Sequence, residues 1–316
     1  MVTLRARFIT LATFGVIAWW LIPNCANTAT GQETAATKMI QPTGEVETVH
    51  QGFDFTEGPA WDPRGVLYFS DIPNTTIHRL GDDDKLSKFT ADSKHTNGIM
   101  VAADGRILAC QMDGQVVSYD VDSAKATVLA DSFQGKRFNA PNDLVIDESG
   151  GIYFTDPLFR APEPLPQGVQ AVYYISAAGE VTRVTDHIAA PNGIGLSPDG
   201  KQLYVAPSRQ AEMLVYDVDG PGKLSGGRTL CRLKQPEGKD DTGGDGMAVD
   251  VEGNLYFTTN LGVEIFSSDG QHRGLVTFPE QPANVTLGGP DGKTMYVTAR
   301  TGLYRVRMPI AGLKPN

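Results

Sequence analysis

Residues 98–130 read GIMVAADGRILACQMDGQVVSYDVDSAKATVLA, and this stretch decides the fold. It contains four apolar runs typical of strands, at 98–102, 106–111, 115–120 and 126–130. The turns between them carry Asp followed by Gly or Ser, at 104–105, 113–114 and 122–123. Asp and Gly are residue types that hairpin turns favour. The stretch is therefore predicted to form a four-stranded antiparallel meander.

The same arrangement occurs six times along the chain. Each repeat has a turn glycine that leads into an apolar run, at Gly65, Gly105, Gly150, Gly200, Gly253 and Gly292. The successive spacings are 40, 45, 50, 53 and 39 residues, and a four-stranded propeller blade has a period of roughly 40 to 50 residues. A β-sandwich would not explain repetition at this period. The fold class is therefore predicted to be all-β, a six-bladed β-propeller with four-stranded antiparallel blades.

The last repeat is one strand short. After residue 284 only three strand-like runs remain, at 285–287, 294–298 and 302–308. Residues 45–53 alternate as a strand does and are predicted to supply the fourth, so that the N- and C-terminal strands close the ring. The predicted domains are a signal peptide at 1–31, a linker at 32–44, the propeller at 45–310 and a C-terminal tail at 311–316.

The first 31 residues have the pattern of an export signal. Arg5 and Arg7 precede an apolar run at 8–23, which is short for a membrane-spanning helix of about 20 residues. A lipoprotein modified at Cys25 and an uncleaved N-terminal anchor are the alternatives. All three place the folded domain outside the cytoplasm, in the periplasm or secreted. The two remaining cysteines are Cys110 and Cys231. An oxidising compartment permits a disulfide between them, but buried free thiols are expected.

Composition limits the partners. The formal net charge is −10 at pH 7, and it becomes −12 without the first 31 residues, whose only charges are two arginines. An acidic chain with no basic stripe argues against nucleic acid. With 35 Gly and 20 Pro among 316 residues, the chain favours short strands and turns over helices. Closed propellers are often monomers, so a monomer that acts on a small molecule is expected.

One polar residue lies eight positions before each turn glycine. The six are Glu57, Asn97, Asn142, Asn192, Asp245 and Asn284. Equivalent positions of a propeller's repeats surround one axis, so these side chains are expected to converge. For Asn97 and Asn284, local hydrogen bonding to the backbone is an equally good explanation.

The other four residues suggest a cation site. Glu57 and Asp245 supply two carboxylates, and Asn142 and Asn192 supply two amide oxygens. Ca²⁺ prefers six to eight oxygen ligands, so this set with added water would suit it. The lack of His and Cys at these positions argues against copper and disfavours zinc. The predicted cofactor is one divalent cation, Ca²⁺ first, with Zn²⁺, Mg²⁺ and Mn²⁺ as alternatives.

Five short motifs together resemble the gluconolactonase and regucalcin (senescence marker protein) family. They are Glu57-Gly58-Pro59, Pro141-Asn142-Asp143, Pro191-Asn192-Gly193, Asp245-Gly246-Met247 and GGPDGK at 288–293. The resemblance extends over about residues 45–310. It implies a six-bladed propeller that hydrolyses sugar lactones with one divalent metal in its axial channel.

The resemblance also implies residue roles. Glu57, Asn192 and Asp245 would be metal ligands, and Asp245 would also be the catalytic acid/base. Asn142 would be a further ligand or a substrate contact. We expect other substrate contacts from Asn97, Arg137 and Asn284. Many bacterial members carry a His-Gly-Asn-Arg-Arg run where this chain has MDGQV at 112–116, so substrate recognition on that side is expected to differ.

The predicted function is therefore metal-dependent hydrolysis of a sugar lactone or a related cyclic or aryl ester. Asp245 would either activate a water or attack the carbonyl directly. Contact with a cation lowers the pKa of a carboxylate and weakens it as a base, so both roles stay open. Because related propellers cleave organophosphates or have no known activity, an organophosphate hydrolase and a non-catalytic exported binding propeller are the alternatives.

Overall fold

The computed structural model describes residue 1, residues 38–81 and residues 83–314. The predicted signal peptide at 1–31 and most of the predicted linker lie outside these residues, apart from Met1, so export stays a prediction. The regular elements of the described residues are all β-strands. Among these residues there is no helix of the length and apolarity that a membrane span requires.

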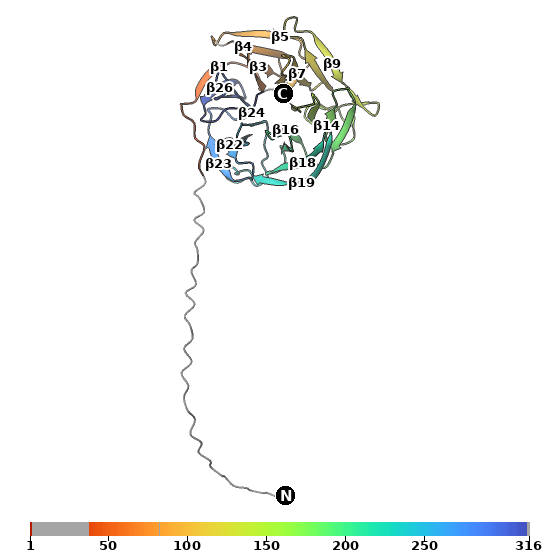
Figure 1. Ribbon diagram of the computed structural model, residues 1–316, viewed down its shortest axis with the longest axis vertical. Helices are drawn as coiled ribbons and strands as arrows, with labels where there is room; N and C mark the ends of the chain where they lie inside the picture. The colour runs from red at the N-terminus through yellow and green to blue at the C-terminus, as the bar shows by residue number, and fades with distance from the viewer. Residues whose placement is uncertain (2–37, 82, 315–316) are drawn as a thin grey trace. The chain divides into compact units, whose positions relative to one another are not determined.

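The strands form six four-stranded antiparallel sheets arranged as the blades of a ring (Figure 1). Blade 1 contains β2 (Thr56–Asp62), β3 (Val66–Asp71), β4 (Thr76–Leu80) and β5 (Leu86–Thr90). Blade 2 contains β6 (Thr96–Val101), β7 (Ile107–Gln111), β8 (Gln115–Tyr119) and β9 (Ala126–Ala130). Blade 3 contains β12 (Leu144–Ile146), β13 (Ile152–Asp156), β14 (Ala171–Ile175) and β15 (Val181–Thr185).

The second half of the ring repeats this plan. Blade 4 contains β16 (Pro191–Leu196), β17 (Gln202–Pro207), β18 (Glu212–Gly220) and β19 (Lys223–Arg232). Blade 5 contains β20 (Met247–Val249), β21 (Leu255–Thr259), β22 (Gly262–Phe266) and β23 (His272–Val276). Blade 6 contains β24 (Pro282–Gly288), β25 (Thr294–Ala299), β26 (Gly302–Arg307) and β1 (Glu47–Gln51). The six-bladed propeller is thus confirmed.

Both ends of the propeller chain meet in blade 6. Strand β1 pairs antiparallel with β26, with Glu47 opposite Arg305 and Gln51 opposite Gly302. The Arg305 Nε also donates a 2.8 Å hydrogen bond to Glu47 Oε2. The predicted closure of the ring by its terminal strands is confirmed, and it leaves blade 6 without a missing strand.

The turn glycines and the apolar runs after them explain why the repeats fold as blades. All six turn glycines have a positive φ, between 66° and 96°, a region that side-chain-bearing residues rarely adopt. The runs that follow are buried, as at Leu67, Tyr204 and Tyr256, each of which is fully buried. Their side chains fill the space between neighbouring blades.

Three segments depart from the simple repeat. A two-stranded hairpin, β10 (Ser132–Phe133) with β11 (Lys136–Arg137), lies between blades 2 and 3 and was not predicted. Ile40, in the predicted linker, is buried and its N–H donates to Arg273 O at 2.7 Å. In the predicted C-terminal tail, Gly312 pairs with Asp250. Apolar and backbone contacts therefore extend the folded unit beyond both predicted ends.

Cys110 and Cys231 are both buried and unbonded to each other. The prediction of two buried free thiols is confirmed. Burial raises the pKa of the Cys231 thiol to about 12, so this side chain packs as a small apolar group rather than a reactive thiolate.

Candidate functional site

The predicted polar residues lie at bulges near the starts of the innermost strands. In blade 1, Glu57 pairs with Ser70 and Ala60 with Tyr68, so two residues of β2 oppose one residue of β3. The register also shifts at Asn97 and Gly98 in β6 and at Asn192 and Gly193 in β16, and in β24 it shifts just before Asn284. In blade 3, Asn142 N donates to Thr155 O at 2.8 Å. Bulges redirect side chains and are common beside active sites.

A glycine follows the polar residue in four blades, at Gly58, Gly98, Gly193 and Gly246. Gly193 N donates a 2.9 Å hydrogen bond to Asp245 O of the next blade. A Cβ added to Gly193 would lie 2.5 Å from the same oxygen, and one on Gly246 would lie 2.1 Å from Asn284 Cγ. Adjacent innermost strands approach this closely only because no side chain separates them.

Replacing Gly193 with Ala is expected to lower the free energy of unfolding by about 1 to 3 kcal/mol, because the added methyl group meets backbone rather than a movable side chain. The same shift would separate Asn192 from Asp245. Urea denaturation measures the loss. The matched control is Gly44→Ala, where the added Cβ would make only ordinary contact, 3.5 Å from Arg307 Cβ. Equal stability of the two variants would contradict the close-approach explanation.

Asn192 and Asp245 form the centre of the site. Asn192 Nδ2 donates hydrogen bonds to Asp245 Oδ1 at 2.7 Å and to Ser208 Oγ at 2.9 Å. Its other amide atom, Oδ1, is buried and has no hydrogen-bond partner among the described residues. Buried polar atoms normally have a partner. An unsatisfied oxygen beside a carboxylate is suited to a cation.

Glu57 brings a second carboxylate to this centre. Its side chain is 2% exposed, and Gly58 N donates to its Oε2 at 2.8 Å. Burial, and then the negative charge of Asp245, raise the pKa of Glu57 well above its usual value. A hydrogen bond from Asn284 acts in the opposite direction. The structure therefore brings Glu57, Asp245, Asn192 and Asn284 together.

Burial also raises the pKa of Asp245, while the hydrogen bond from Asn192 and the positive charge of Arg300 lower it. The two carboxylates are thus buried close together with little compensating charge. Each ionised carboxylate is costly in such a place unless a cation accompanies it.

A third carboxylate, Asp143, was not predicted. Leu144 N donates to its Oδ1 at 2.9 Å, and Asn284 Nδ2 lies 3.4 Å from its Oδ2. Burial raises the pKa of Asp143 to about 7. Its sequence signals are its position directly after Asn142 and its place in the Pro141-Asn142-Asp143 motif. Ordinary strand alternation sends two consecutive side chains to opposite faces, so the sequence pattern gave no reason to place both at the axis.

The three other predicted residues, Asn97, Asn142 and Arg137, make no hydrogen bond to Glu57 or Asp245 among the described residues. Asn97 is buried, with Nδ2 3.9 Å from Met112 Sδ and with Oδ1 unpartnered among the described residues. Asn142 is buried in the neighbouring blade, and its carbonyl oxygen accepts a 2.8 Å hydrogen bond from Gly98 N. Arg137 is exposed on the β10–β11 hairpin and donates to Phe138 O at 3.0 Å. Its side-chain hydrogen bonds go to the carbonyl oxygens of Phe138 and Asn139.

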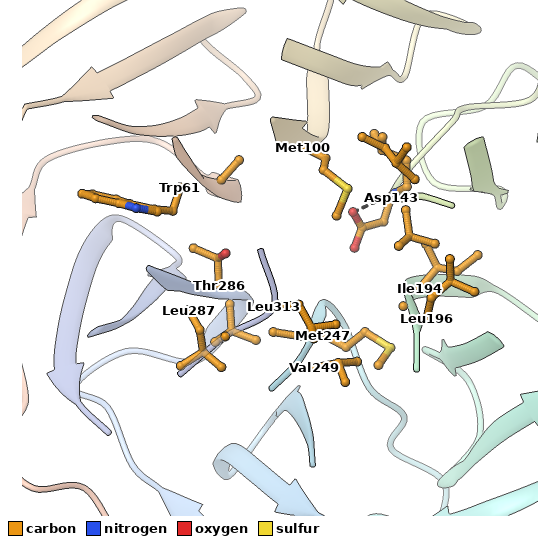
Figure 2. Close-up of a pocket in the computed structure, with 18 of the residues that line it drawn as sticks. Trp61, Met100, Asp143, Ile194, Leu196, Met247, Val249, Thr286, Leu287 and Leu313 are labelled. Carbon is orange, nitrogen blue, oxygen red and sulfur yellow. Dashed lines mark hydrogen bonds between the residues drawn. The ribbon is translucent and has the colours of Figure 1, made fainter. Parts of the chain in front are cut away.

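An apolar cavity of about 200 Å³ lies between the innermost strands, with Asp143 and Asn284 in its lining. It is lined by side chains of all six innermost strands, among them Met100, Leu196 and Met247. Figure 2 shows the Asp143 carboxylate pointing into this cavity among apolar side chains. Gly312, Leu313 and Lys314 line it as well. The Asp143 carboxylate of the polar site therefore borders a cavity lined mainly by apolar side chains.

The donor set determines which cation the site fits. No group of three or more His, Cys, Asp or Glu side chains in the described part of the chain forms a metal site by itself. The predicted set contains only two such groups, Glu57 and Asp245, and therefore needs the amide oxygens of Asn142 and Asn192. The unpartnered Asn192 Oδ1 and the two crowded carboxylates fit a hard divalent cation bound through oxygen.

Comparison with known proteins gives consistent matches. Residues 55–301 match the model of the SMP-30/Gluconolactonase/LRE-like region. A gluconolactonase of Zymomonas mobilis is 32% identical over 293 residues, covering 84% of this chain and 82% of that protein. The pentonolactonase XacC of Haloferax volcanii is 27% identical over 252 residues, covering 78% and 81%. The solved structure of a gluconolactonase from Xanthomonas campestris superposes with a TM-score of 0.78 at 27% identity, covering 86% and 95%.

Proposed function

Because the chain belongs to the SMP-30/gluconolactonase/LRE-like family, we propose that it is a hydrolase of sugar lactones that depends on a divalent cation. One observation carries the proposal: Asn192 holds Asp245 at 2.7 Å while the oxygen of the same amide stays unpartnered among the described residues. A buried carboxylate and an oxygen donor suited to a cation thus lie at one point of the axis. The substrate class follows the relatives named gluconolactonase and pentonolactonase.

Glu57, Asn142, Asn192 and Asp245 would hold the cation, with Ca²⁺ favoured because all the donors are oxygen atoms. When bound, the cation polarises the ester carbonyl and stabilises the negative charge that develops on its oxygen. Ser208 keeps Asn192 in place by accepting the hydrogen bond from its Nδ2.

Asp245 acts on the water that opens the ring. The water oxygen forms a bond to the carbonyl carbon while one of its protons passes to a carboxylate oxygen of Asp245. The bond between that carbon and the ring oxygen then breaks, and Asp245 returns the proton to the ring oxygen as a new hydroxyl. The product is a hydroxy acid, which loses its acidic proton to solvent.

Chelation provides the first test. With Ca²⁺ present, acid release from gluconolactone and from a pentonolactone is expected above the spontaneous rate. Removing the cation with a chelator is expected to return release to the spontaneous rate, and added Ca²⁺ is expected to restore it, because the carbonyl is then polarised again. A pH-stat measures the release. Circular dichroism of the chelated sample checks that the propeller stays folded.

The same assay separates lactone hydrolysis from the two alternatives, organophosphate hydrolysis and binding without catalysis. An aryl ester and a phosphotriester are added to the two lactones as substrates, each with Ca²⁺, Zn²⁺, Mg²⁺ or Mn²⁺. Faster cleavage of the phosphotriester than of any lactone would identify an organophosphate hydrolase. Failure to cleave any member with any of these cations would favour a binding propeller. Full lactone turnover in the chelated sample would contradict the proposed metal dependence.

A further inference from the structure

Arg300 occupies an unfavourable backbone position at the mouth of the channel. It lies between β25 and β26, in a two-residue turn that joins Ala299 to Gly302. Its φ is +46°, a region in which a residue with a side chain is strained. Glycine would fit this position at lower cost. Strain at a residue that glycine could replace is often associated with function.

Contacts from three directions hold Arg300 in place. Its carbonyl oxygen accepts a 2.8 Å hydrogen bond from Thr56 N, directly beside Glu57. Its Nη2 donates to Gln281 Oε1 at 2.5 Å. Its guanidinium lies over the ring of Phe55, 5.3 Å from the centroid. Such stacking fixes the plane of a guanidinium.

The Arg300 guanidinium makes no ion pair with Asp245. Its positive charge acts on the Asp245 carboxylate, yet no carboxylate in the described part of the chain lies within ion-pair distance of Arg300. Within the described residues, Nη2 is the only side-chain nitrogen of Arg300 that makes a hydrogen bond. The side chain is exposed. A fixed cation with unused N–H donors thus lies in the turn beside Thr56 and Glu57, and its charge acts on Asp245.

We propose that Arg300 binds the carboxylate group that lactone hydrolysis creates. This inference rests on the proposed function. Asp245 activates the attacking water, and the oxygen of that water becomes one of the two carboxylate oxygens of the product. A guanidinium matches those two oxygens with parallel N–H donors. The neutral lactone has no such group, so Arg300 is expected to distinguish product from substrate.

The test compares inhibition by gluconate in four variants, with Ca²⁺ saturating. In Arg300→Gln, the inhibition constant of sodium gluconate is expected to rise about 10- to 100-fold, as for the loss of a hydrogen bond to a charged group. The KM for gluconolactone is expected to change less. Arg300→Lys keeps the positive charge but lacks the paired N–H donors of a guanidinium. It is therefore expected to bind gluconate more tightly than Arg300→Gln and less tightly than wild type. Arg106→Gln, which removes an exposed charge paired with Asp104, is the matched control and is expected to behave as wild type.

Arg300→Gly separates a role in binding from a role in folding. Because glycine suits the positive φ, this variant is expected to unfold at the same urea concentration as wild type or higher, while it loses gluconate binding as Arg300→Gln does. Sorbitol, which has a hydroxyl group in place of gluconate's carboxylate and otherwise the same hydroxyl groups, is expected to inhibit all variants equally. Higher salt is expected to weaken gluconate inhibition in the wild type and not in Arg300→Gln.

An inhibition constant in Arg300→Gln within twofold of the wild-type value would overturn the assignment. So would an equal rise for gluconate and sorbitol, since the carboxylate would then not be the group bound. The proposed function fails in a different way, through absence of lactone turnover in the wild-type chain. Normal wild-type turnover with unchanged gluconate inhibition therefore rejects only the role of Arg300.

Discussion

Asp245→Asn is expected to lower the kcat of lactone hydrolysis by about 10²- to 10⁴-fold, the usual contribution of a positioned acid/base. Asparagine keeps the shape of the side chain and can still contact Asn192, but it cannot take the proton of the attacking water. The rate is measured at saturating Ca²⁺, so that weaker cation binding does not explain the loss. Asp241→Asn is the matched control, since this carboxylate is 76% exposed in the loop before the site.

A single turnover in ¹⁸O-labelled water can distinguish whether Asp245 acts as a general base or as a nucleophile. If Asp245 removes a proton from water, the label appears only in the product. If Asp245 attacks directly, hydrolysis of the acyl-enzyme at the Asp245 carbonyl places the label in the protein, where mass spectrometry of the peptide detects it. Near-normal turnover of Asp245→Asn would exclude both roles.

Glu57→Gln is expected to change cation affinity and stability in opposite directions. Loss of one of two charged ligands should weaken Ca²⁺ binding by on the order of 100-fold or more, since even residues behind the ligands contribute 10- to 100-fold. In the cation-free protein the same change removes a buried charge that lies near Asp245. The free energy of unfolding is therefore expected to rise by about 1 to 3 kcal/mol. Calorimetric titration and urea denaturation measure the two effects.

The gain in stability should depend on pH. Glu57 titrates near pH 4.3 in the unfolded chain, by the usual value of about 4.3, and at higher pH in the folded chain because burial raises its pKa. The folded chain keeps the proton over that interval, so its stability falls as pH rises through it. Glu57→Gln should thus match wild type at about pH 4 and exceed it at about pH 8.5. Glu180→Gln, at an exposed position, is the control and should show no such trend. If the cation-free Glu57→Gln variant is no more stable than wild type at the higher pH, the claim that ionised Glu57 destabilises the folded chain is wrong.

The repeat made most of the fold predictable from sequence. A turn glycine with a polar residue eight positions before it recurs in every blade, so the positions of Glu57, Asn192 and Asp245 followed from one pattern. Their meeting at one axis follows from the ring. The closing strand was predictable as well, because three strands after residue 284 cannot complete a blade of four.

Other features depend on backbone geometry that the pattern does not encode. Asp143 joins the site because it and Asn142 both lie opposite Thr155, with Asn142 N donating to Thr155 O and Thr155 N donating to Asp143 O. No residue type specifies this irregularity. The position of Arg300 depends on a turn with positive φ, for which arginine is an unexpected residue. The β10–β11 hairpin has only two residues in each strand, too few for a periodic signal. Arg137 was expected near substrate from its place in the chain, but the hairpin directs it to backbone carbonyls.

The pairing of β1 with β26, which closes the ring in blade 6, also determines how the molecule responds to tension. Glu47, at the start of β1, lies opposite Arg305, near the end of β26. A force that pulls the two chain ends apart therefore acts on one end of this antiparallel pair, and its hydrogen bonds are loaded one after another instead of all together. The hydrogen bonds between β1 and β26 would break in order from Glu47 towards Gln51. Strand β1 would therefore separate from blade 6 before the force reaches the other five blades.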